Sequence, residues 1–167
     1  MRRELQCVKH ALAKFNEHAI SFDGQLLKRG FWLYVWRIGH GSRTVFYVGR
    51  TGDTSSENAA SPFNRLSQHL SLRKNSKGNA LARNLAVCGM NPEECRFEFF
   101  ALGHLYPETK SVDVHKELRD LMMAAERFAA DWLRERGKEV LGEHPRKRDC
   151  ELNLQQIVEK FLLSKFA

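Results

Sequence analysis

Two runs of aromatic and β-branched residues lie close together in the chain: FWLYVWRI at 31–38 and TVFYVGR at 44–50. Residues of these types are typical of β-strands, because they pack well on a pleated surface. The short segment between the runs contains Gly39 and Gly41, which provide the backbone freedom that a tight turn requires. The pattern therefore predicts an antiparallel β-hairpin, and this hairpin restricts the fold to classes that contain a β-sheet.

Other segments place apolar residues three and four positions apart, as amphipathic helices do. Ser61-Pro62 predicts the start of one helix, because serine caps helices well and proline suits the first helical position. The apolar residues expected on its buried face are Phe63, Leu66 and Leu70. Three further helices are predicted at 3–18, within 78–87 and at 152–166.

The longest predicted helix covers 112–136 and follows a third strand, CRFEFFAL, at 95–102. The residues expected on its buried face are Leu118, Leu121, Met122, Ala125, Phe128, Ala129 and Trp132. Together the elements predict an α+β (α/β) fold: a small three-stranded antiparallel sheet flanked by helices. We expect a single domain over 1–167, with a core at about 31–136 and the helices at 3–18 and 152–166 packed on it, since 167 residues divided between two domains would leave thin cores.

The charge balance indicates a polyanionic partner. The net charge is +7 and the pI is about 9.4, which favours association with nucleic acid, a membrane surface or ribosomal components. No apolar run approaches the roughly 20 residues that a membrane span needs. Polar residues such as Glu4 and Lys9 interrupt the N-terminal segment, which excludes a signal peptide, and we expect a cytoplasmic protein.

The four cysteines carry no recognisable metal motif. They are Cys7, Cys88, Cys95 and Cys150, and they form no C-x-x-C pair. A structural zinc site is therefore not expected, and in a reducing compartment the cysteines are interpreted as small buried apolar residues.

One set of residues occurs in an order that is typical of a known family. The set is Tyr34, Tyr47, Arg50, Arg65, His69 and Glu126. It resembles the GIY-YIG nuclease family, found in homing endonucleases, some restriction enzymes and the N-terminal domain of a bacterial excision-repair nuclease. Tyr47-Val48-Gly49 is similar to the second signature triplet, and Tyr34 is the only matching residue where the first triplet belongs.

The rest of the resemblance covers residues up to about 136. Arg65-x-x-x-His69 matches a pair on the family's helix, and Glu126 matches its metal-binding glutamate. Two departures are clear: residues 53–60 look like an insertion, and Asn153 is poorly spaced for the asparagine that often follows the metal helix.

The resemblance implies a metal-dependent DNA endonuclease that hydrolyses phosphodiester bonds. Glu126 would then hold one Mg²⁺ or Mn²⁺ ion. Tyr34 would activate the attacking water or pass on its proton, and Arg65 would bind the charge that develops on the phosphate. The residues that would orient water and phosphate are Tyr47, Arg50 and His69.

Each of these residues also has an ordinary structural interpretation. The predicted hairpin would pair the strands of Tyr34 and Tyr47 antiparallel, so that their phenols approach across the sheet, but strand tyrosines also commonly pack in the core. Arg65 and His69 are four positions apart on one helix face, which a solvated surface would equally explain. The carboxylate of Glu126 would then be a surface partner; the candidate partners are Arg127 and Arg119.

Basic residues outside this set are candidates for contacts with DNA phosphates, which give affinity without reading sequence. They are Arg73, Lys74, Lys77, Arg83, Arg146, Lys147 and Arg148. Two alternatives remain open: a basic nucleic-acid-binding module of the same fold without catalytic activity, and a small structural or ribosome-associated protein. The sequence also leaves open a homodimer and the biological setting, whether restriction, homing, repair or toxin activity.

Overall fold

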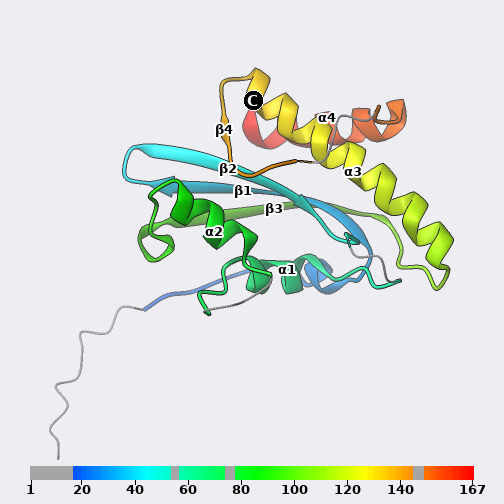
Figure 1. Ribbon diagram of the computed structural model, residues 1–167, viewed down its shortest axis with the longest axis horizontal. Coiled ribbons are helices and arrows are strands. Elements are labelled where there is room, and N and C mark those ends of the chain that lie inside the picture. Colours follow the sequence, from blue (N-terminus) through cyan, green and yellow to red (C-terminus); the bar gives the residue numbers. More distant parts are fainter. Residues whose placement is uncertain (1–16, 54–56, 74–77, 145–148) are drawn as a thin grey trace, which may run out of the picture.

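The computed structural model describes residues 17–53, 57–73, 78–144 and 149–167 (Figure 1). Four strands form one mixed sheet in the order β3-β1-β2-β4. The strands are β1 (Phe31–His40), β2 (Arg43–Arg50), β3 (Arg96–Tyr106) and β4 (Glu139–Val140). The α+β class and the hairpin at 31–50 are therefore confirmed.

The expected three-stranded antiparallel sheet is wrong in one respect. β1 pairs antiparallel with both β2 and β3, but β4 adds a fourth strand that runs parallel to β2 and pairs with Val45 and Phe46. β4 has only two residues, too few to show the alternation by which a strand is recognised in a sequence.

Helices cover both faces of the sheet (Figure 1). The short helices α1 (Pro62–His69) and α2 (Ala80–Val87) lie on one face, and α3 (Val112–Glu135) and α4 (Leu152–Phe166) lie on the other. Two 3₁₀ turns, Gly24–Leu27 and Pro92–Glu94, complete the regular structure of the described residues. None of the helices in these ranges combines the length and the apolar character that crossing a membrane would require.

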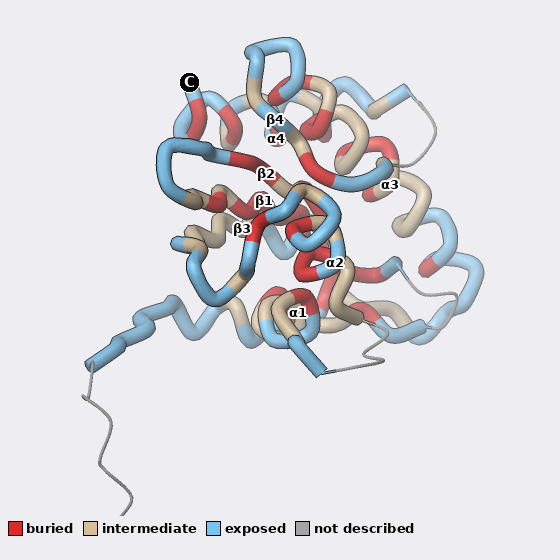
Figure 2. Tube along the Cα trace, turned by 60° about the vertical axis from the view of Figure 1, so that its left-hand side comes forward, coloured by how far each residue is buried: buried red, intermediate tan, exposed pale blue. Residues whose placement is uncertain are grey.

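Successive residues along β1 point alternately to the two faces of the sheet and pack against the helices on each face. Phe31, Leu33 and Val35 belong to the core under α3 and α4, whereas Tyr34 and Trp36 belong to the core under α1 and α2. β1 is thus buried on both faces, as Figure 2 shows for the centre of the sheet. This explains why FWLYVW shows no alternation of apolar and polar residues.

The predicted helix boundaries agree with the structure for four helices. α1 begins after Ser61, whose hydroxyl accepts a hydrogen bond from the backbone N–H of Asn64 at 3.3 Å. α3 and α4 match the predictions at 112–136 and 152–166, and α2 lies within 78–87. Most of the predicted helix at 3–18 lies outside the described residues, and Glu17 and His18 are not helical.

The predicted buried face of α1 is confirmed only in part, since Leu66 and Leu70 pack against the core under α1 and α2. Phe63, Leu66 and Leu70 are only half-buried, whereas His69 is 5% exposed. α1 is turned so that His69 lies against the tyrosines of the hairpin, and its apolar residues face the edge of the smaller core. On α3, by contrast, the predicted face is confirmed: Met122, Ala125, Ala129 and Trp132 are buried, and Leu118, Leu121 and Phe128 pack beside them.

Candidate active site

A small cavity of about 190 Å³ lies near the end of β2, between α1 and α3. β4 pairs only with Val45 and Phe46, so beyond them no described strand pairs with this edge of β2. Side chains from both helical layers therefore reach the same space. The cavity is lined by Tyr34, Tyr47, Gly49, Arg50, Asp53, Arg65, His69, Gly78, Ala80 and Glu126, and the structure thus brings together all six residues of the predicted site.

The hairpin register places the two tyrosines on one face. Tyr34 is opposite Gly49, and Tyr47 is opposite Trp36. Since Tyr34 and Trp36 are two residues apart on β1, they point to the same face, and Tyr47 points there with them. The sequence alone predicts that the phenols can approach each other, and the structure adds that His69 lies against both rings, with centroids 5.6 Å from Tyr34 and 5.2 Å from Tyr47.

Tyr34 and His69 form a buried hydrogen bond. The phenol oxygen of Tyr34 lies 2.6 Å from His69 Nε2, and the two residues are 2% and 5% exposed. The solvated-surface interpretation of His69 is therefore wrong. The core interpretation of Tyr34 is correct for its ring, but its side chain also lines the cavity.

Burial keeps both partners of this hydrogen bond uncharged at neutral pH. Burial raises the pKa of the Tyr34 phenol well above its ordinary value, and nearby Arg65 and Arg50 only partly oppose the shift. Burial and the charge of Arg65 lower the pKa of His69 to about 4. The pKa of Tyr47 is raised to about 12, chiefly by burial and then by Glu126. Neighbouring arginines thus lower the pKa of both tyrosines, but burial outweighs them.

Gly49 provides the space that the Tyr34 ring occupies. A Cβ atom added at Gly49 would lie 2.6 Å from Tyr34 Cε2 and from its hydroxyl oxygen, closer than packed atoms can approach. The glycine of the second triplet is therefore required by side-chain packing across the hairpin.

Gly49→Ala is expected to lower the free energy of unfolding by about 1–3 kcal/mol, because the added methyl group must displace the Tyr34 ring. The comparison is Gly39→Ala in the same hairpin, where an added Cβ meets nothing within 4 Å; this change should alter stability by less than about 1 kcal/mol. Urea unfolding of both variants measures the difference. Equal losses would show that Gly49 is not required for the packing of Tyr34.

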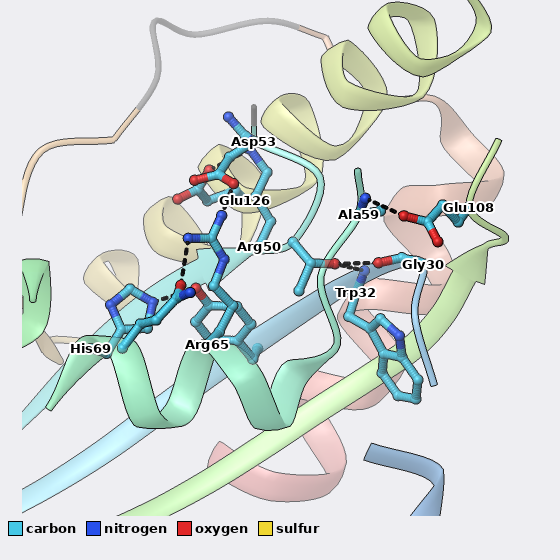
Figure 3. Close-up of polar contacts among 12 residues, drawn as sticks. Gly30, Trp32, Arg50, Asp53, Ala59, Arg65, His69, Glu108 and Glu126 are labelled. Atoms are coloured by element: carbon cyan, nitrogen blue, oxygen red, sulfur yellow. Dashed lines mark hydrogen bonds and ion pairs between the residues drawn. The ribbon is translucent and has the colours of Figure 1, made fainter. Parts of the chain in front are cut away.

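Two ion pairs join the acidic and basic side chains of the cavity (Figure 3). Arg50 Nε lies 2.9 Å from Glu126 Oε2, and the side chains are 10% and 14% exposed. Burial raises the pKa of Glu126, and Arg50 opposes that shift. The interpretation of Glu126 as a surface partner of Arg127 or Arg119 is therefore wrong. Arg127 pairs with Asp131, and Arg119 pairs with Asp120.

The second ion pair joins Arg65 to Asp53, a residue that the sequence did not assign to the site. Asp53 follows Gly52, which adopts a positive φ of 72°. The preceding Thr51 is fully buried; its hydroxyl donates to the carbonyl of Gly30 and accepts from the N–H of Trp32. These contacts direct the chain across α1, and no motif in the sequence indicates such a path.

Four nitrogen atoms of the cavity residues are buried without a hydrogen-bond partner in the described part of the chain. They are Arg50 Nε, Arg50 Nη1, Arg65 Nε and His69 Nδ1, and of these Arg50 Nε lies in the ion pair with Glu126. Unsatisfied guanidinium nitrogens are costly unless a ligand accepts from them, so the two arginines are suited to an anion such as phosphate.

No family model, curated protein or solved structure matches the chain. The residues that line the cavity are therefore the evidence for its chemistry.

The acidic residues of the cavity fit a hard divalent cation. The described residues contain no group of three or more histidine, cysteine, aspartate or glutamate side chains arranged as metal ligands, which does not suit zinc. Mg²⁺ and Mn²⁺, in contrast, are held by one or two carboxylates and keep water and substrate phosphate as their other ligands. Glu126 and Asp53 are the two carboxylates that line the cavity, and they are the residues that would hold such a cation.

The predicted DNA-contacting residues are only partly within the described ranges. Arg83 is exposed on α2 and close enough to Tyr47 to lower its pKa, and Arg73 is exposed just after α1. Lys74, Lys77, Arg146, Lys147 and Arg148 lie outside the described residues. Asn153 is exposed at the start of α4 and does not line the cavity.

Proposed function

We propose that the protein is a GIY-YIG-type endonuclease that hydrolyses DNA phosphodiester bonds with Mg²⁺ or Mn²⁺. The observation that carries this proposal is the buried Tyr34–His69 hydrogen bond at 2.6 Å. It lies in the same small cavity as two arginines and Glu126. A proton acceptor, an anion-binding pair and a metal-binding carboxylate are the groups that phosphodiester hydrolysis requires.

In the proposed mechanism the attacking water gives a proton to the Tyr34 oxygen, and Tyr34 gives its own proton to His69 Nε2. The water oxygen forms a bond to phosphorus as the bond to the leaving oxygen breaks, and the leaving oxygen takes a proton from solvent. Neutral His69, protonated on Nδ1, is able to accept the proton of Tyr34, and it returns that proton to solvent after the reaction. The high pKa of Tyr34 means that it transfers a proton without becoming a free phenolate.

The two arginines bind and stabilise the phosphate. Arg65 and Arg50 each have a buried nitrogen available to an oxygen of the phosphate, and their charge stabilises the negative charge that develops there. Glu126 would hold the divalent cation, with Asp53 as a second available carboxylate. When bound, the cation would supply Lewis-acid stabilisation of the leaving oxygen.

DNA is the proposed substrate because the net charge of +7 and the exposed Arg73 and Arg83 favour a long polyanion. A binding module without catalysis would need exposed basic residues alone. It gives no reason for a buried tyrosine–histidine pair beside two buried arginines.

The test is cleavage of supercoiled plasmid and of branched DNA by the purified protein, with Mg²⁺, with Mn²⁺ and with EDTA. We expect strand cleavage with either metal and none with EDTA. Glu126→Gln, purified in parallel, controls for a contaminating nuclease. Binding without cleavage under all conditions would favour the binding module, and the absence of both would exclude both functions.

A further inference from the structure

We propose that Asp53 occupies the phosphate-binding nitrogen of Arg65 in the substrate-free protein, and that a phosphodiester must displace it to bind. This proposal rests on the proposed function, and it assigns to Asp53 a positioning role in the site.

The position of Asp53 is set by buried neighbours on its N-terminal side. Thr51 is held by hydrogen bonds with Gly30 and Trp32, and Gly52 lies directly against the ring of Phe31. On the far side of the same loop, the backbone N–H of Ala59 donates to Glu108 at 2.9 Å. Thr51 and Gly52 are therefore held against the start of β1, and Ala59 is held by a residue that follows β3; Figure 3 shows Asp53, Arg65 and Glu126 directed toward one another.

Asp53 holds the nitrogen that both two-nitrogen binding modes of Arg65 require. A guanidinium binds an anion with two parallel hydrogen bonds either through Nη1 and Nη2 or through Nε and Nη2. Nη2 of Arg65 pairs with Asp53, and Nη1 donates to Gln68 at 3.3 Å. Nε is buried and has no hydrogen-bond partner among the described residues. A phosphate that binds through Nε and Nη2 would satisfy Nε, but only after Asp53 has left Nη2.

The exposed fractions of the four side chains indicate which of the two ion pairs separates at lower cost. The side chain of Asp53 is 41% exposed, whereas that of Arg65 is 15% exposed. Water can therefore solvate the carboxylate of Asp53 when it leaves, while Arg65 stays in the cavity. In the other pair both side chains are mostly buried, at 10% for Arg50 and 14% for Glu126, so separating them exposes a buried charge at greater cost.

The ion pair with Asp53 thus makes Arg65 selective for phosphate over weaker anions. A monodentate or weakly charged ligand does not replace a carboxylate on Nη2, but a phosphate offers two oxygens and a full negative charge to Nε and Nη2 together. The consequence is that wild-type affinity for phosphate is reduced by the competition with Asp53. Asp53 and Glu126 line the same cavity, so the carboxylate that leaves Arg65 stays within one site with the carboxylate that would hold the cation.

The test is Asp53→Asn, which keeps the shape of the side chain and removes its charge. Affinity for a short DNA duplex is measured by fluorescence anisotropy in EDTA, where no cleavage occurs. We expect roughly tenfold tighter binding, because a charged competitor has been removed from Nη2. The matched control is Glu57→Gln, which removes one exposed charge from the same loop and should change affinity by less than about threefold.

Two further measurements make the result specific to Arg65. In an Arg65→Gln background, Asp53→Asn should have no more effect than Glu57→Gln. In a titration with inorganic phosphate followed by NMR of the arginine side chains, the Arg65 Nε–H signal should shift at a lower phosphate concentration in Asp53→Asn than in the wild type. The phosphate titration does not depend on DNA being the substrate, so it tests the ion pair even if the wild type never cleaves DNA.

The proposal would be overturned if Asp53→Asn behaved like Glu57→Gln in both assays, or if its effect persisted without Arg65. A wild type that cleaves DNA together with either of these results would reject the role of Asp53 and retain the proposed function.

Discussion

Glu126→Gln is expected to reduce single-turnover DNA cleavage by on the order of a thousandfold, since it removes the carboxylate that holds the cation while keeping the shape of the side chain. DNA affinity in EDTA should stay equal or rise, because a negative charge near the bound phosphate has been removed. Glutamine is preferred to alanine here. The amide oxygen still accepts from Arg50, whereas alanine would leave a guanidinium that is 10% exposed without its partner and would cost about 3–5 kcal/mol of stability.

The matched control is Glu98→Gln on β3. Glu98 also pairs with an arginine, through two hydrogen bonds from Arg37 at 2.6 and 2.9 Å, but it does not line the cavity. Cleavage by Glu98→Gln should equal that of the wild type, and its stability should change by less than about 1 kcal/mol because the pair is partly exposed. If Glu126→Gln cleaved DNA as fast as Glu98→Gln, the cation would not bind at Glu126.

The parts of the fold that follow from local residue types could be predicted. The hairpin follows from its aromatic and β-branched residues and its glycines, and the start of α1 follows from Ser61-Pro62. Tyr34 and Tyr47 were expected to approach each other, because an antiparallel hairpin brings residues of adjacent strands side by side. These features depend on the chain within one or two elements, so they are visible in the sequence.

The features that were missed depend on contacts between distant segments. β4 exists only because two residues after α3 meet the edge of β2. His69 is buried because α1 is turned toward the hairpin, although its apolar residues suggested another orientation. The pairing of Asp53 with Arg65 depends on the path of the chain after β2. That path is fixed by contacts of Thr51 and Gly52 with residues at the start of β1. No local pattern of residues encodes these three results.

The proposed mechanism depends on the hydrogen bond between Tyr34 and His69. Tyr34→Phe removes one hydroxyl and keeps the ring that packs over Gly49. Cleavage should fall by about 10²–10⁴-fold, the usual contribution of a positioned proton-transfer group. Stability should fall by about 1–3 kcal/mol, because His69 Nε2 loses its buried partner. DNA affinity should be unchanged, since the arginines that bind phosphate remain in place.

The pH dependence separates a chemical role of Tyr34 from a purely structural one. The pKa of His69 is lowered to about 4 and that of Tyr34 is raised, so neither group changes charge between about pH 5.5 and 8. The ratio of wild-type to Tyr34→Phe cleavage rates should therefore stay constant across that range. Below it, protonation of His69 removes the proton acceptor, and the wild-type advantage should decline as the pH falls toward 4.

Tyr106→Phe, which removes a half-buried hydroxyl outside the cavity, should cleave like the wild type at every pH. If Tyr34→Phe retained full activity, or if the ratio changed steeply near pH 6.5, the transfer of a proton from Tyr34 to a neutral His69 would be excluded.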